Sequence, residues 1–551
     1  MDDLHIFSER LKKLYSHWDS QRLNLWGSSN VLTFATSEQK EQKTKRSIDE
    51  KAQRRNTLRL KGSVICKWLF GRVIFKSIFV LMKDQIYCLS SNHEFSFLQL
   101  VGPIAKQAVG ADFQLYVKSD DDGDGSGLMD VIIRNLNAGA LVGHIKLEIL
   151  KGDVAKLWFR KIKQDRRVQL VDASRGLSEL FSVKDRYELF KVRKSASFAA
   201  HVMKNVMIPE VDKIIKGKQK ISHSSMSVNT LNAIRQLSDV SVVASPPVFQ
   251  SGECFDLKPL IPCNNKQLKY SPQSIIISSV GTKFEYYNSF IARTFLIDPT
   301  DSQRKAYTVL HDAHIAAIFK LKPGNKVSDA YEAAVSCVKE KVPALSAKLL
   351  KHAGSGIGLE IHEPELNVHG KNELLVKEGM VFNLFVGFLN IRSDVRGKKF
   401  SLWLADTVIV NSAGPEVITA ECSKRIEDII LPFVEGGERQ PGFMVLDDDD
   451  DDHLIVEDMR IDCDSDDFIF EALRIWTQLE AKDKKIKELN SKLEELNAAN
   501  ERNMIANQED LASITADKEK LAKALKEAEL AEQIQSQFDE FDLLFDVVLD
   551  S

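Results

Sequence analysis

His362 and Glu363 stand side by side in the stretch "GSGIGLEIHEPELNVHG", residues 354–370, a few positions after a turn flanked by glycines. An imidazole and a carboxylate are side chains that bind metal ions and transfer protons in many enzymes. Two such residues alone cannot hold a metal ion, so a hydrogen-bonded pair that supports the loop is the favoured interpretation. Ser355 lies between two glycines, but no Ser–His–Asp set or nucleophile elbow accompanies it. The stretch also lacks the G-x-G-x-x-G frame of a phosphate-binding loop.

Alternating helix and strand patterns surround this stretch and predict an α+β domain. An amphipathic pattern over residues 184–215 predicts a long helix that opens the domain. Residues 306–321 and 327–342 show the same spacing and predict two further helices. The domain extends over residues 175–430, a length within the usual range of a single domain.

The first 170 residues mix helix and strand patterns and predict a separate α/β lobe. Residues 6–18, "IFSERLKKLYSHW", have helical spacing. Residues 64–83 are the most apolar stretch, yet Lys67, Arg72 and Lys76 interrupt it, so two adjacent strands are expected rather than a membrane helix. The acidic, amphipathic start is unlike a secretory signal, and no membrane anchor is visible.

Charge is distributed unevenly along the 551 residues. The formal net charge is −4, but residues 447–471 alone contain thirteen Asp or Glu and one Arg. The rest of the chain is therefore mildly basic, and the acidic segment is expected to bind basic partners. Seven cysteines without a C-x-x-C pair indicate reduced, buried thiols in the cytosol or nucleus.

Two charged segments have both a functional and a simpler interpretation. Asp120, Asp122 and Asp124 are spaced as in a calcium loop, but Val131 stands where a bidentate Glu is needed, which favours a solvated turn. The basic run at residues 37–62 could bind nucleic acid or direct nuclear import. A solvated helix or flexible insertion is preferred, because no aromatic residues interleave for base stacking.

The C-terminal part divides into three predicted segments. Residues 431–470 form an acidic linker whose composition predicts disorder. Residues 471–535 show heptad spacing with one four-residue slip and predict a coiled coil that can self-associate. Residues 536–551 alternate acidic and apolar side chains and suggest a docking motif or a frayed end. The apolar heptad positions are Ala472, Ile475, Leu479, Ile486, Leu489, Leu493, Leu496, Leu511, Ile514, Leu521 and Leu525.

Residues 180–430 resemble the pita-bread fold of the methionine aminopeptidase, aminopeptidase P and creatinase superfamily. Its metallopeptidases bind two divalent ions with two Asp, one His and two Glu, and these ions activate a water molecule. Gly281 and the "RTF" at residues 293–295 fix the register of the first strand pair, and "GSGIGL", "GMVF" and "DTV" fix the rest. The resemblance assigns the five ligand positions to Ser279, Phe290, Ser355, Phe385 and Ala405. It therefore implies a peptidase-like fold without metal ligands, and no cofactor.

Within this superfamily the chain resembles the large subunit of the histone chaperone FACT (facilitates chromatin transcription). The matching motifs include "FSERLKKLYSHW", "YELFKVRKSA", "SPPVFQSGECFDLKP" and "GSGIGLEIHEPELNVHGKN". The resemblance implies an N-terminal lobe at residues 1–170 and a domain that binds peptides or histones without cleaving them. It makes His362 and Glu363 a remnant of a peptide-contact site.

The resemblance implies a nuclear, non-catalytic chromatin protein that helps to disassemble and reassemble nucleosomes in transcription, DNA replication and repair. The expected partners are core histones or nucleosomes and the HMG-box partner subunit, although the family's heterodimerisation region is missing here. A coiled-coil scaffold with a vestigial peptidase fold and an active X-Pro metallopeptidase are the alternatives. Six residues form the core of the expected histone-binding segment: Asp447, Asp448, Asp449, Asp450, Asp451 and Asp452.

Overall fold

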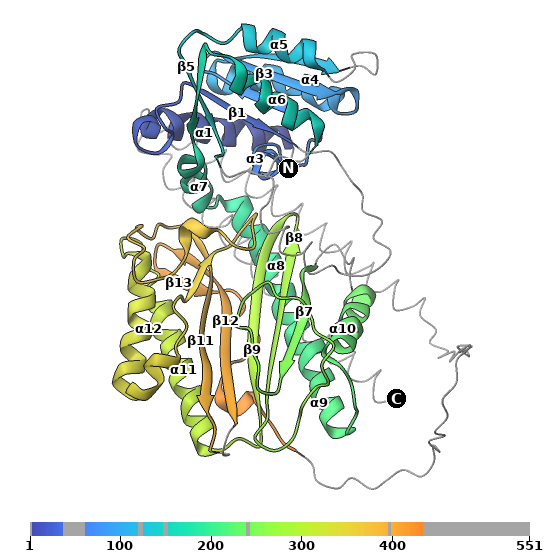
Figure 1. Cartoon of the computed structure of the whole chain (residues 1–551), viewed down its shortest axis with the longest axis vertical. Helices are drawn as coiled ribbons and strands as arrows, with labels where there is room; N and C mark the ends of the chain where they lie inside the picture. Colours follow the sequence, from blue (N-terminus) through green and yellow to red (C-terminus); the bar gives the residue numbers. More distant parts are fainter. Residues whose placement is uncertain are drawn as a thin grey trace, which may run out of the picture. The chain divides into compact units, whose positions relative to one another are not determined.

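A computed structural model describes residues 3–36, 61–118, 125–146, 152–237, 243–394 and 398–433. These residues form an N-terminal α/β lobe and a larger pita-bread domain, which belong to one compact unit (Figure 1). The predicted fold class is confirmed for this part of the chain. The described residues do not include the acidic run 447–452, residues 434–470 of the predicted linker, the coiled coil, the C-terminal tail, residues 119–124 or most of the basic run. The predicted start of the disordered linker at residue 431 is wrong, because Leu431 lies in a strand, Ile430–Leu431.

The N-terminal lobe is built on a six-stranded mixed sheet with the strand order β4-β3-β2-β1-β5-β6. The pairs β1–β2 and β2–β3 are antiparallel, whereas β1–β5, β3–β4 and β5–β6 are parallel. The strand bounds are β1 Val31–Ala35, β2 Ile78–Leu81, β3 Gln85–Ser91, β4 Asp112–Lys118, β5 Ala140–His144 and β6 Val168–Asp172.

Helices cover both faces of this sheet, because alternate side chains of each strand point to opposite sides. One face packs on α5 and α6, and the other contributes to the larger core with α1, α3, α4 and α7. The helix bounds are α1 Asp3–Leu25, α3 Lys61–Phe70, α4 Phe95–Val109, α5 Ser126–Arg134, α6 Asp153–Gln164 and α7 Ser174–Ser182.

The prediction of two adjacent strands over residues 64–83 is wrong in its first half. Lys61–Phe70 forms helix α3, and Gly71, with a φ of 70°, follows it in the left-handed region. All but one of the residues from Val64 to Phe70 are buried. An apolar run that is buried on nearly every side shows no helical period, so the sequence cannot distinguish such a helix from a strand. The second half is correct, since it contains β2.

The pita-bread domain is built on an eight-stranded sheet whose main path runs β10-β11-β12-β9-β8-β7. Strand β13 pairs with β12, and β14 pairs in parallel with β9. The strand bounds are β7 Val243–Ser251, β8 Ile275–Phe284, β9 Tyr287–Ile297, β10 Gly354–Gly356, β11 Val381–Arg392, β12 Lys399–Asn411, β13 Gly414–Val417 and β14 Ile430–Leu431.

The three predicted helices of this domain are present. The long one begins with a capping box at Asp185 and Glu188 and runs through a π-helical segment, Val202–Met207. Figure 1 shows α8 behind β8 and β9, and α11 and α12 beside β11. The helix bounds are α8 Arg186–His201, α9 Ile208–Lys216, α10 His223–Leu237, α11 Asp301–Lys320 and α12 Val327–Lys341.

Two further expectations concern the membrane and the cysteines. In the ranges that the structure describes, no helix is both long and apolar enough to cross a membrane. The six cysteines within those ranges are free thiols. Cys66, Cys88 and Cys422 are buried as expected, but Cys254 is exposed on a loop after β7. The prediction that all the thiols are buried is therefore wrong for Cys254.

Candidate functional site

The strand register of the large sheet brings the five predicted ligand positions to one face. Directly paired residues of antiparallel strands point to the same side, as do residues two apart along one strand. Ser279 of β8 pairs with Ala292 of β9. Ala292 pairs with Ala405 of β12, which in turn pairs with Phe385 of β11. Side chains from four strands therefore converge on this surface, here called the site face.

The remaining two positions join the site face through the same rule. Phe290 lies two residues from Ala292 on β9, and Ser355 of β10 pairs with Asn383, two residues from Phe385. All five positions are at most 2% exposed. The predicted glycine turn around Ser355 is a short strand. An added Cβ at Gly354, whose φ is 134°, would lie 2.3 Å from a backbone oxygen of β11, so the glycine is required by close strand packing.

Aromatic rings occupy much of the site face. Trp403 of β12 lies between two phenylalanines, with ring centroids 5.8 Å from Phe290 and 5.9 Å from Phe385. The imidazole of His352 contacts the Phe385 ring edge-on at 5.4 Å. Such pairs contribute about 0.5–1.5 kcal/mol each beyond the burial of their area. The face is thus packed as a hydrophobic core.

The polar groups on the site face are neutral. Ser279 and Ser355 offer hydroxyl oxygens, and Asn383 offers a carboxamide. Divalent ions of hydrolytic centres are held by carboxylates and imidazoles, and this donor set does not fit a pair of them. Within the described ranges, no group of three or more His, Cys, Asp or Glu side chains is arranged to hold a metal ion.

Glu363, one of the two predicted peptide-contact residues, is engaged in a buried ion pair. The Nζ of Lys184 donates to both carboxylate oxygens of Glu363 at 2.8 Å. The side chain of Lys184 is 1% exposed and that of Glu363 is 14% exposed. His362, the other predicted residue, is exposed on the same loop. These neighbouring residues therefore have different environments: the carboxylate of Glu363 is neutralised by Lys184, whereas the imidazole of His362 lies at the surface.

Lys184 belongs to a network of polar contacts between the N-terminal lobe and the pita-bread domain. It lies in the segment between α7 and α8, next to Asp185, whose carboxylate accepts from Nε of Arg10 on α1 at 3.0 Å. Lys13 of α1 donates to the carbonyl of Val183 at 2.9 Å. Burial alone would raise the pKa of Asp185, but the attraction of Arg10 and the hydrogen bonds from Arg10 and the Glu188 backbone together lower it.

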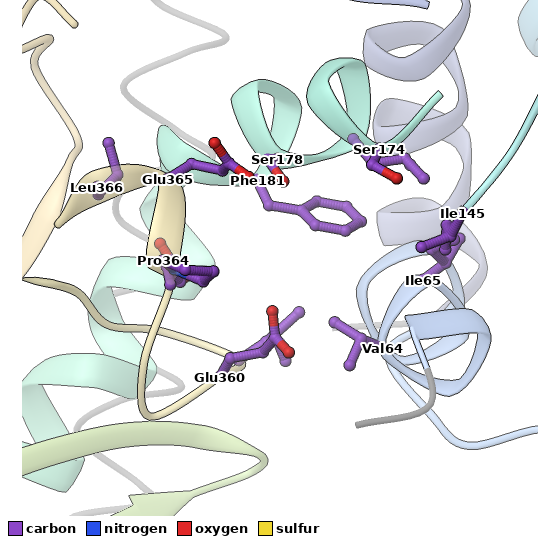
Figure 2. Close-up of a pocket in the computed structure, with 13 residues that line it drawn as sticks. Val64, Ile65, Ile145, Ser174, Ser178, Phe181, Glu360, Pro364, Glu365 and Leu366 are labelled. Atoms are coloured by element: carbon purple, nitrogen blue, oxygen red, sulfur yellow. The ribbon is translucent and has the colours of Figure 1, made fainter. Parts of the chain in front are cut away.

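A small pocket of about 50 Å³ lies between the N-terminal lobe and the loop that carries Glu363 (Figure 2). Val64, Ile65 and Phe181 supply apolar walls from the lobe, and Pro364 and Glu360 face them from the loop.

A buried charge cluster lies on the opposite face of the sheet. Asp406 of β12 accepts hydrogen bonds from Nη2 of Arg293 at 2.7 Å and from Nζ of Lys424. The hydroxyl of Thr419 donates to the same carboxylate at 2.8 Å. His314 of α11 lies 3.8 Å from Asp406 and, like Arg293 and Asp406, is completely buried. The charged neighbours of His314, Asp406 and Lys424, are about a hundred residues away along the chain, so residue spacing gives no sign of this cluster.

The charges in this cluster shift the pKa values of its members. Burial and, to a lesser extent, the nearby Lys424 cation together lower the pKa of His314 to about 3. Burial alone would raise the pKa of Asp406, but attraction by Arg293 and Lys424 holds it well below its usual range. His314 is thus neutral and accepts from Lys424 at 3.3 Å, while its Nε2 donates to the carbonyl of Leu384 at 3.2 Å. The cluster is therefore a structural support beneath the sheet. The motif residues Arg293 and Asp406 were its only signal in the sequence.

The strands and helices around the site face have the pita-bread fold, which this chain shares with metallopeptidases. Residues 191–412 match the metallopeptidase family M24. The X-Pro aminopeptidase from Thermotoga maritima is 15% identical, with a TM-score of 0.53, and the match covers 75% of this chain and 99% of that one. At this identity the likeness establishes the pita-bread fold.

The N-terminal lobe identifies a particular branch. Residues 3–176 match the N-terminal lobe domain of FACT complex subunit SPT16. The N-terminal domain of SPT16 from Cicer arietinum (chickpea) is 38% identical, with a TM-score of 0.71, over 78% of this chain and 100% of that one. SPT16 from Zea mays is 40% identical over 449 residues, 79% of this chain and 41% of that protein.

The chain therefore belongs to the SPT16 family, and the family resemblance predicted from its motifs is confirmed. It spans about two fifths of the length of the curated relatives that it matches, such as those from Zea mays and Oryza sativa.

Proposed function

We propose that this chain is a non-catalytic, histone-binding chromatin protein that acts in the nucleus. Its role would be that of the FACT large subunit, helping to disassemble and reassemble nucleosomes during transcription, replication and repair. Membership of the SPT16 family supports this proposal, since its relatives are named as subunits of the FACT complex.

The chemistry of the site face supports the proposal that this chain does not hydrolyse peptides. Peptidases of this fold need carboxylates and an imidazole to hold the ions that activate water. Here the five aligned positions present two hydroxyls, two phenyl rings and a methyl group, and Trp403 packs between the rings. A domain with this face has no means of activating water through a pair of bound metal ions.

Charge complementarity supports histones as the partners. The segment at residues 447–471, with thirteen acidic side chains and one Arg, would attract basic histones much as DNA does. The HMG-box subunit and a second copy of this chain, paired through the predicted coiled coil at 471–535, are further proposed partners. The end of the linker and the boundaries of the coiled coil stay predictions.

Core-histone binding by the full chain tests this proposal. The full chain is compared with a variant in which Asp447 to Asp452 are all replaced by Asn, which keeps the length but removes six charges. We expect histone pull-down by the full chain, weaker capture by the variant, and a loss of capture as salt screens the attraction. Failure of the full chain to capture any histone at low salt would contradict the proposal. Histone-independent self-association would then favour the scaffold alternative.

A further inference from the structure

Helix α6 presents a row of basic side chains on its solvent side. Lys156, Arg160 and Lys163 are spaced at i, i+4 and i+7, which places them on one face of the helix. All three are exposed, and none forms an ion pair with any carboxylate that the structure describes. This row, here called the α6 basic row, extends over about 10 Å of helix.

The α6 basic row is held in a fixed position by the buried side of the same helix. Ala155, Trp158 and Ile162 pack into the core beneath the N-terminal sheet. The indole Nε1 of Trp158 donates to the hydroxyl of Thr33 on β1 at 2.9 Å, which fixes the rotation of the helix about its axis. The three cations therefore project from a rigid element.

Further arginines extend the basic surface beyond the end of α6. Arg166 follows the helix and is exposed. Arg167 donates to the carbonyl of Ile133 at 3.1 Å, so the end of α6 lies against the end of α5. Arg134, the last residue of α5, is exposed beside this contact.

Two of the carboxylates around the basic row are already neutralised. Asp130 of α5 pairs with Lys161 at 2.6 Å, and Asp165 pairs with Arg167 at 2.7 Å. Asp153 lies in the first turn of α6, where a negative charge stabilises the positive end of the helix dipole. Residues 153–167 contain six basic and two acidic side chains, so this surface has a net positive charge.

We propose that the α6 basic row binds the phosphate backbone of duplex DNA without sequence preference. A row of exposed cations matches the regular line of phosphates along a strand, and binding releases condensed counterions. The exposed residues of the row are Lys and Arg without interleaved aromatic rings, which favours contact with phosphates over stacking on bases. This DNA contact goes beyond the proposed histone binding and involves a different part of the chain.

The salt dependence of DNA affinity tests the inference. Binding of the full chain to a short fluorescein-labelled duplex is measured by fluorescence anisotropy at several salt concentrations. The test variant carries Lys156→Ala, Arg160→Ala and Lys163→Ala. Removal of three phosphate contacts is expected to reduce the slope of log affinity against log salt by about 2.7. Two duplexes of unrelated sequence should give the same affinity.

A matched variant controls for general loss of charge. Arg304→Ala, Lys320→Ala and Lys339→Ala remove one Arg and two Lys that are also exposed, on α11 and α12. The basic run at residues 37–62 is present in both variants, so its contribution to DNA binding cancels in the comparison. The control should keep the slope of the unmodified chain, and both variants should unfold at the same temperature as that chain.

Three results would overturn the inference. One is no measurable duplex binding by the full chain at low salt, and another is the same slope in the α6 variant and its control. The third is an α6 variant that loses affinity for an oligo-aspartate peptide while its affinity for DNA is unchanged. That last result would assign the row to an acidic protein partner.

Discussion

Phe290 and Phe385 determine the character of the site face at the scale of single residues. Each occupies a position that the resemblance assigns to a metal ligand, and each packs on Trp403. A phenyl ring donates no electron pair to a cation and excludes the water that hydrolysis needs. Both positions are buried in the middle of the sheet, so the rings contribute to stability as core residues do.

Phe290→Ala should lower the free energy of unfolding by about 3–5 kcal/mol, because it leaves a cavity beside Trp403 that the surrounding strands cannot fill. Urea unfolding followed by Trp fluorescence measures the change. Phe319→Ala is the matched control, since Phe319 on α11 is 60% exposed and its loss should cost less than about 0.5 kcal/mol. Equal effects of the two substitutions would show that the ring of Phe290 is not a core residue.

His314 should make the stability of the domain depend on pH. Its folded-state pKa is about 3, so below the ordinary histidine value the unfolded chain binds a proton that the folded chain does not. The free energy of unfolding therefore falls as pH decreases from about 6.5 towards 3, by up to about 1.4 kcal/mol per pH unit from this one group.

His314→Gln removes this titration. Chemical unfolding of the variant and the unmodified chain between about pH 4 and 7.5 should give a shallower decline for the variant. Overall destabilisation by the substitution shifts the whole curve but does not change its slope. Parallel curves would contradict the assignment of a neutral, buried His314.

At the scale of elements, the segment between α7 and α8 connects the N-terminal lobe to the pita-bread domain. It supplies Lys184 to the loop of Glu363 and Asp185 to Arg10 of α1. The same segment provides the N-cap of α8, where Asp185 accepts from the backbone of Glu188 at 2.8 Å. One short stretch thus fixes the N-terminal lobe, the start of the long helix and the loop that borders the pocket.

Lys184→Met should destabilise the chain by about 3 kcal/mol, because it leaves the mostly buried carboxylate of Glu363 without its cation. Adding Glu363→Gln removes the uncompensated charge and should recover part of this loss, which thermal or urea unfolding would reveal as a non-additive double-mutant cycle.

The exposed pair of Lys106 and Asp112 serves as the control for that cycle. Both side chains are more than half exposed, so Lys106→Met should cost less than about 1 kcal/mol. Strictly additive effects of the substitutions at Lys184 and Glu363 would show that these two side chains do not stabilise each other.

The helices show where the sequence is sufficient and where it is not. The helices predicted over residues 184–215, 306–321 and 327–342 are present, because one side of each is apolar at regular spacing. The second begins five residues earlier than predicted, at Asp301. Helix α3 cannot be predicted in this way, because Val64, Ile65 and Trp68 are part of a segment that is buried on nearly every side. Its helical form depends on tertiary packing that no local pattern records.

At the scale of the whole molecule, sequence motifs identify the five positions of the site face. Only the pairing of the strands shows that these positions lie on the same face of the sheet. Ser279, Phe290, Ser355, Phe385 and Ala405 span more than a hundred positions, yet adjoining strands bring them together. The sequence did not predict the charge cluster around Asp406 or the ion pair between Lys184 and Glu363. Their partners are far apart in sequence, and pairing of single charges leaves no periodic signal.

The metal content of the purified full chain shows whether the site face can still hold a pair of divalent ions. The chain is incubated with Mn²⁺ or Co²⁺, passed through a desalting column and analysed by elemental analysis. We expect no stoichiometric metal, because the site face presents hydroxyls and aromatic rings where carboxylates and an imidazole are required. A pair of tightly bound ions per chain, accompanied by cleavage of X-Pro peptides, would contradict it.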